Sequence, residues 1–143
     1  MADELPKQIG NKTECGLLGF VTATGGSYEE IREQYPTEKF AKVYTFNSAR
    51  KMMSTIIKSA DSPGYILFAK GASEMVLSKC GYYLDSAGQV VSMPPEKIDS
   101  IIKNVVEKMA SNGLRTICVA ARKFVPTEET NKESNHKYFS QSK

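Results

Sequence analysis

The sequence predicts an α+β fold in which a mainly antiparallel sheet is flanked by helices, and three observations support this class. Runs of β-branched and aromatic residues follow one another along the middle of the chain. Helical patterns lie before and after them, without the strict alternation of strands and helices that a parallel sheet requires. The length of 143 residues corresponds to one ordinary domain with one hydrophobic core.

The beginning of the chain predicts two short helices that form a helical hairpin. The first is expected over residues 14–21, with the hydroxyl of Thr13 as its cap. A Gly-Gly pair then breaks the chain. Ser27 and Glu30 have the S-x-x-E spacing of a capping box, so we expect the second helix to begin there and to end near Pro36.

Three strands are predicted next. Residues 43–46, 53–57 and 65–68 are rich in β-branched and aromatic side chains. Turn-forming residues separate these runs. The three strands are therefore expected to form an antiparallel meander.

A short helix and a hairpin are expected after the meander. Ser73 is the predicted N-cap of a helix that buries residues 75–77. Residues 82–84 and 89–92 then predict two short strands, with a turn at residues 85–88.

The strongest helical pattern follows Pro94 and Pro95, which suit a helix start. Its apolar residues recur at the spacing of one buried stripe. They are Ile98, Ile101, Ile102, Val105, Val106 and Met109. Gly113 ends this helix, and residues 114–121 predict a mostly buried strand with Arg115 at its entrance.

Composition excludes several classes of protein. The formal charge of +3 is small and its basic residues are spread along the chain, so no nucleic acid partner is expected. Apolar runs are no longer than about five residues, whereas a membrane span needs about 20, so no direct membrane contact is expected. We expect a monomer whose domain covers residues 1–125, with a polar, mobile tail at residues 126–143.

The cysteines and the histidine predict no metal site and no disulfide framework. Cys15, Cys80 and Cys118 are odd in number, far apart in sequence and set among apolar residues, which indicates a reduced, cytosolic protein. The single His136 lies in the polar tail, where we expect a solvated side chain.

Motifs for catalysis are absent, since the chain has no Walker A loop, no GxGxxG, no GxSxG and no histidine pair at metal spacing. Three segments instead place a small or aromatic residue beside a cation at a predicted strand end: residues 46–51, 70–71 and 113–115. Adenine needs an aromatic face and closely approaching backbone, and phosphates need cations. Taken alone, these segments fit either a nucleotide site or ordinary turns with solvated lysines.

Four ordered segments carry a resemblance to a known family. They are NKTECGL at 11–17, FNSARKMMS at 46–54, KGASE at 70–74 and GLRTICVAAR at 113–122. In order and spacing they resemble the nucleotide-binding (N) domain of a P-type calcium-transporting ATPase, closest to the plasma-membrane calcium pumps. The resemblance covers nearly the whole chain and implies a cytoplasmic domain of a plasma-membrane protein.

The resemblance implies an adenine pocket around Phe46, Lys70 and Gly71. Phe46 matches the phenylalanine that stacks on adenine, and Lys70 with Gly71 matches the lysine and glycine of the KGA motif. The residues alone leave another interpretation for each, because Phe46 also suits a core position and Lys70 a solvated strand end.

Three further residues match nucleotide contacts of the family. Glu14 matches the acidic residue near the purine edge, Lys51 a pocket lysine, and Arg115 the arginine that reaches the ribose and phosphates. Glu14 equally suits the first turn of a helix, where the macrodipole favours an acid. Other pumps of the family can carry an arginine just after the stacking phenylalanine. This chain has Ser48 at that position, so one phosphate contact of the family is in doubt.

The parent protein implied by the resemblance binds ATP with Mg²⁺ and presents the γ-phosphate to an aspartate on a separate domain, which drives calcium export. Its partners are the phosphorylation and actuator domains. Motifs of those domains, DKTGT, TGES and DPPR, are missing here. We therefore expect a fragment, truncated at both ends of the domain, that has no catalytic residue and does not hydrolyse ATP.

Two alternatives stay open at the level of sequence. One is the nucleotide-binding domain of a P-type ATPase that moves another cation, because the membrane helices that select the ion are absent. The other is a protein-interaction module without a nucleotide site, for which the distinguishing feature is a large exposed apolar patch.

Overall fold

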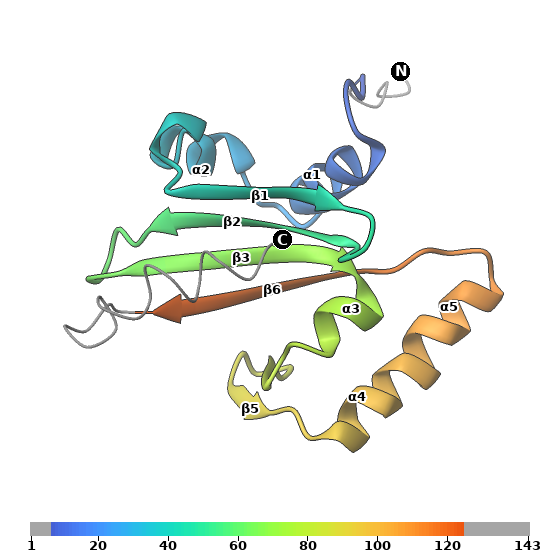
Figure 1. Ribbon diagram of the computed structural model, residues 1–143. Helices are drawn as coiled ribbons and strands as arrows, with labels where there is room; N and C mark the ends of the chain where they lie inside the picture. The colour runs from blue at the N-terminus through green and yellow to red at the C-terminus, as the bar shows by residue number, and fades with distance from the viewer. Residues whose placement is uncertain (1–6, 125–143) are drawn as a thin grey trace. The chain divides into compact units, whose positions relative to one another are not determined.

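The structure, a computed structural model, describes residues 7–124 (Figure 1). The predicted tail at 126–143, with His136, lies outside these residues. The chain divides into two compact units, Met1–Lys39 and Phe40–Lys143. None of the described helices is long and apolar enough to cross a bilayer.

The first unit contains the two expected helices. Its elements are α1 (Lys12–Ala23), α2 (Tyr28–Gln34) and the 3-10 turn η1 (Thr37–Lys39). The Thr13 cap is wrong: Asn11 is the extended residue before α1, and its Oδ1 accepts from the backbone N–H groups of Thr13 at 2.8 Å and Glu14 at 3.4 Å. Ser27 does occupy the N-cap of α2, but its hydroxyl donates to Glu29 and makes no capping bond, so the capping box is also wrong.

The second unit is built on the predicted antiparallel meander. The four strands are β1 (Lys42–Asn47), β2 (Met52–Lys58), β3 (Tyr65–Ala72) and β6 (Ile117–Phe124). Their order is β1-β2-β3-β6, and every neighbouring pair is antiparallel. The prediction of a mostly buried final strand is wrong, because β6 pairs with β3 alone and exposes most of its residues. The predicted α+β class is confirmed.

Helices and a small hairpin complete this unit. The elements are α3 (Ser73–Leu77), β4 (Tyr82–Leu84), β5 (Val90–Ser92), α4 (Pro95–Ile101), the π-helical turn η2 (Ile102–Glu107) and α5 (Lys108–Ser111). Helix α3 follows β3 directly and contacts β3, β6 and η2 (Figure 1). The hairpin β4–β5 agrees with the prediction.

The core of the sheet lies under α3. Val76 is only 1% exposed and packs with Met52 and Ala69. Around them are the partly buried side chains of Leu67, Cys80, Cys118 and Ala120. Burial of these apolar side chains supplies the main stabilisation of the second unit.

Two predictions about helices are wrong in detail. Ser73 does not cap α3; Ala72 holds that position, while the buried Ser73 hydroxyl donates to Thr116 Oγ1 at 2.8 Å. In the long helix Val106 is buried, but Val105 and Met109 are exposed. The π-helical turn η2 changes the angle between successive side chains, so an apolar stripe spaced for an α-helix does not stay on one face.

Candidate functional site

The connection from β1 to β2 is a tight turn held by Asn47. Its Oδ1 accepts from the backbone N–H groups of Ala49 at 2.9 Å and Arg50 at 3.2 Å, and its carbonyl accepts from Lys51 N–H at 2.7 Å. Lys51 has φ 51°, a left-handed conformation that is uncommon for a residue with a side chain. The dense hydrogen bonding shows why this conformation persists, since the surrounding backbone fixes it.

A shift of register lies directly before this turn. Tyr44 is opposite Ser54 and Asn47 is opposite Met52, so β1 advances three residues where β2 advances two. The extra residue leaves Thr45 and Phe46 together opposite Met53, as in a β-bulge. Phe46 is 65% exposed, although it is a large apolar side chain.

The register also relates Phe46 to Lys70. Met53 pairs with Lys70 on β3, and residues directly opposite one another form one row across a sheet. Phe46 and Lys70 therefore lie in the same row, two strands apart, which corresponds to about 10 Å. Lys70 is half-buried.

Gly71 lies against the backbone of the β1–β2 turn. A Cβ at this position would collide with the carbonyl oxygen of Lys51 and would lie 2.6 Å from Met52 Cβ. The same carbonyl accepts from Ala72 N–H at 2.9 Å. Close approach of two backbones, rather than an unusual φ, is thus what requires glycine here.

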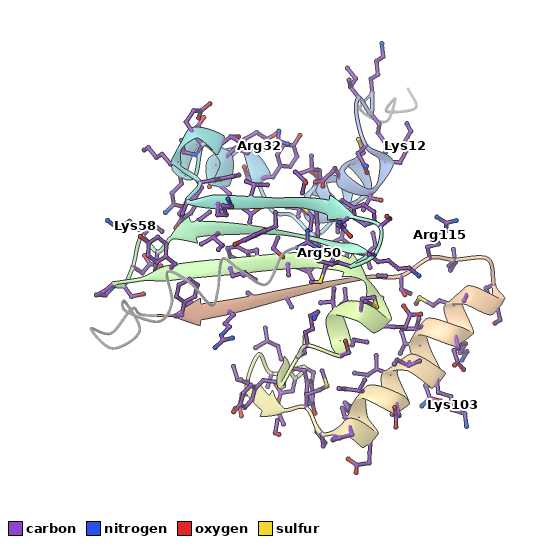
Figure 2. The ribbon with its side chains drawn as sticks, in the orientation of Figure 1. Lys12, Arg32, Arg50, Lys58, Lys103 and Arg115 are labelled. Atoms are coloured by element: carbon purple, nitrogen blue, oxygen red, sulfur yellow. The ribbon has the colours of Figure 1, made fainter. Side chains whose placement is uncertain are left out.

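Arg115 lies at the same end of the sheet. The registers place the end of β1, the start of β2, the end of β3 and the start of β6 together, because Asn47 pairs with Met52, Met52 with Gly71, and Ala72 with Ile117. Arg115 is exposed on the segment between α5 and β6 (Figure 2). The hydrogen bond from Ser73 to Thr116 ties this segment to the start of α3.

The structure thus brings five of the six predicted site residues to one end of the sheet: Phe46, Lys51, Lys70, Gly71 and Arg115. The sixth, Glu14, is exposed in the first turn of α1, in the other unit, so it is not among the residues that the sheet brings together. Lys51, Lys70 and Arg115 thus lie at the same end of the sheet as an exposed aromatic ring, an arrangement suited to an aromatic ligand that bears anionic groups.

Two residues of this end were missed by the site prediction. Asn47 organises the turn, and a signal was present, because asparagine after a strand is typical of an Asx turn. Arg50 donates from Nη2 to the carbonyl of Thr45 at 3.1 Å. No sequence signal distinguishes this arginine from a solvated one, since its partner is a backbone atom that the register shift presents.

Two partly buried thiols pack against the core of the sheet. Cys118 is directly opposite Gly71, and Cys80 packs against the same cluster. Burial raises the pKa of the Cys80 thiol, and burial together with the nearby charge of Cys80 raises the pKa of Cys118. Across residues 7–124 no group of three His, Cys, Asp or Glu side chains is arranged to hold a metal ion.

Comparison with known proteins identifies the family. The family model for the P-type ATPase cytoplasmic domain N matches residues 2–142. The chain is 53% identical over 127 residues to "Plasma membrane calcium-transporting ATPase 2" of Oreochromis mossambicus, covering 89% of this chain and 11% of that protein.

Two further relatives give the same result. "Plasma membrane calcium-transporting ATPase 4" of Homo sapiens is 50% identical over 124 residues, 87% of this chain and 10% of that protein. "Plasma membrane calcium-transporting ATPase 1" of Gallus gallus is 51% identical over 120 residues, 84% of this chain and 10% of that protein. The chain spans about a tenth of the length of these relatives. The resemblance seen in the sequence is confirmed, and the chain belongs to the P-type ATPase family, as its cytoplasmic N domain.

Proposed function

We propose that this domain binds ATP with Mg²⁺ and serves as the nucleotide-binding part of a plasma-membrane calcium-transporting ATPase. One observation carries the proposal: an exposed Phe46 ring lies in one row with Lys70, at an end of the sheet that gathers cations. The exposed ring leaves an aromatic face accessible, and adenine offers a flat face of matching size.

Each residue of the site has a chemical role in this proposal. The adenine ring stacks on Phe46, and Gly71 lets the backbone of Lys51 and Met52 lie close against β3, which keeps the β1–β2 turn in place. Lys51 and Arg115 contact the ribose and phosphates as exposed cations, and Lys70 lines the adenine pocket. For Glu14, the family resemblance alone supports a role at the purine edge. Mg²⁺ arrives on the phosphate oxygens, which are its preferred ligands.

The domain binds and positions the nucleotide, and a separate domain performs the transfer. Binding and orientation alone can supply a large part of the barrier to phosphoryl transfer. In the whole protein the γ-phosphate is presented to an aspartate of the phosphorylation domain, the actuator domain completes the cycle, and the released free energy drives calcium export. We expect the chain to be a monomer and to show no ATP hydrolysis of its own.

An NMR titration of the chain with ATP, ADP and AMP tests this proposal. We expect shifts of backbone signals at Phe46, Lys70 and Gly71, with similar dissociation constants for the three nucleotides, in the high micromolar to millimolar range, about −4 to −5.5 kcal/mol. The affinities are similar because most of the contact is with adenine.

Three results would contradict it. One is the absence of shifts at millimolar ATP, which would favour a protein-interaction module. Another is nanomolar affinity, and the third is binding that requires the γ-phosphate. A P-type ATPase that moves another cation would give the same titration, so the transported ion needs a transport assay on the full-length protein.

A further inference from the structure

The position of the Phe46 ring depends on an irregular piece of backbone. The bulge before the β1–β2 turn interrupts the regular ladder at Thr45 and Phe46. A strand that carries an extra residue can bend in more than one way, so the direction of the ring needs a further constraint. Stacking on a flat ligand requires a defined ring position.

Arg50 supplies a constraint at this point. Its guanidinium Nη2 donates to the carbonyl oxygen of Thr45 at 3.1 Å, and a charged donor forms a stronger bond than a neutral one. The bond reaches back across the turn to the residue directly before Phe46.

The backbone of Arg50 is itself fixed. Its N–H donates to Asn47 Oδ1 at 3.2 Å, and the neighbouring carbonyl of Lys51 accepts from Ala72 on β3 at 2.9 Å. Arg50 is half-buried, unlike the exposed Lys51 that follows it. The backbone of the turn that carries Arg50 is therefore held from the side of β3, the strand that carries Lys70 and Gly71.

We propose that Arg50 is a positioning residue for adenine recognition, whose guanidinium holds the Thr45 carbonyl and so sets where the Phe46 ring stands relative to Lys70. This inference rests on the proposed nucleotide site and adds a residue to it. Arg50 acts through Phe46 and not as a phosphate ligand.

Substitution of Arg50 combined with two ligands tests the proposal. In Arg50→Met the aliphatic stem stays and the donor is lost, so affinity should fall about tenfold, the effect of losing one charged hydrogen bond. The fall should be equal for ATP and for adenosine. The substitution disorders the Phe46 ring, and this ring stacks on the adenine that both ligands contain. Arg50→Lys keeps a donor and should recover most of the affinity.

Two controls define the mechanism. Lys51→Met removes the neighbouring exposed cation and should weaken ATP binding more than adenosine binding, because only ATP carries phosphates. In Phe46→Ala/Arg50→Met the second substitution should add little to the first, because both act on one ring. A loss in Arg50→Met that appears with ATP and not with adenosine would overturn the proposal, since it would make Arg50 a phosphate ligand.

A readout without ligand separates this inference from the proposed function. With the Phe46 ring isotopically labelled, Arg50→Met should shift and broaden its signals in the free protein, and Lys51→Met should not. If the unmodified chain binds neither ATP nor adenosine, the nucleotide function fails and adenine recognition by Arg50 fails with it. If nucleotides bind and the ring signals of Arg50→Met are unchanged, the positioning role alone is overturned.

Discussion

Phe46, near the end of β1, and Val76, on α3 where it packs against β2 and β3, belong to two different regions of the second unit. Val76 is 1% exposed, whereas Phe46 is 65% exposed beside a turn held by hydrogen bonds. The first residue therefore contributes to stability through burial, and the second is held in place while its ring stays accessible. In the proposed account, stability depends on Val76 of α3 and ligand binding on Phe46 of β1.

Gly71 belongs to both regions. On one side it allows the backbone of Lys51 and Met52 to approach, and Lys51 ends the turn that follows Phe46. On the other side it pairs with Cys118, which packs against the core. A change at this position should disturb the core and the site together.

The largest effect is expected for Gly71→Ala. The new Cβ collides with backbone atoms that cannot rotate away, so the free energy of unfolding should fall by about 1 to 3 kcal/mol or more. ATP affinity should fall with it, because the turn must move. Thermal unfolding and an ATP titration of the same sample measure both losses. Unchanged stability of Gly71→Ala would contradict the close approach of Lys51 and Met52 to Gly71. Gly81→Ala is the control, because Gly81 has open space around it.

Val76→Ala should affect one region only. Removing two buried methyl groups should lower the free energy of unfolding by about 1.5 to 3 kcal/mol. The folded fraction should bind ATP within about twofold of the original affinity, since Val76 does not belong to the row of Phe46 and Lys70. Chemical denaturation and a titration well below the melting temperature check this. A large loss of affinity in the folded variant would mean that the two regions are coupled.

The smallest effect concerns pH and the core thiols. Since the pKa values of Cys80 and Cys118 are raised in the fold, the folded state holds these protons more tightly than the unfolded chain does. Their contribution to stability is complete below the unfolded thiol pKa of about 8.5 and is lost as pH rises above it. The melting temperature should therefore decline between pH 8 and pH 10 by a modest amount. In Cys80→Ala/Cys118→Ala the decline should be smaller; an unchanged decline would assign it to other groups.

The elements of the fold followed from sequence where local patterns determine them. The meander, the β4–β5 hairpin and the helix after Pro95 all carry turn or cap signals within a few residues. Errors arose where a tertiary contact decides. Ser73 looks like a cap but bonds to Thr116, 43 positions away, and β6 looks buried but has a neighbour on one side only.

The prediction of the candidate site has a different basis. Phe46, Lys70, Gly71 and Arg115 were identified through family resemblance, and their shared place at one end of the sheet needed the strand register. The requirement for glycine at position 71 also needed the structure, because its φ is ordinary and only the approach of Lys51 reveals it. Arg50 is absent from the predicted site because its partner, the Thr45 carbonyl, lies in a bulge that no residue pattern predicts.

The most direct test of the separation between binding and stability is Phe46→Ala, compared with Tyr82→Ala. Tyr82 is an aromatic residue of nearly the same exposure, 66%, on the β4–β5 hairpin of the same unit. ATP affinity and melting temperature are measured on one preparation of each variant. Loss of stacking should weaken ATP binding by about 1 to 3 kcal/mol in Phe46→Ala, or about 5- to 150-fold, with little change in melting temperature. Tyr82→Ala should change neither quantity appreciably. Unchanged ATP affinity in Phe46→Ala, or unfolding of that variant, would contradict the assignment of Phe46 as an exposed adenine platform.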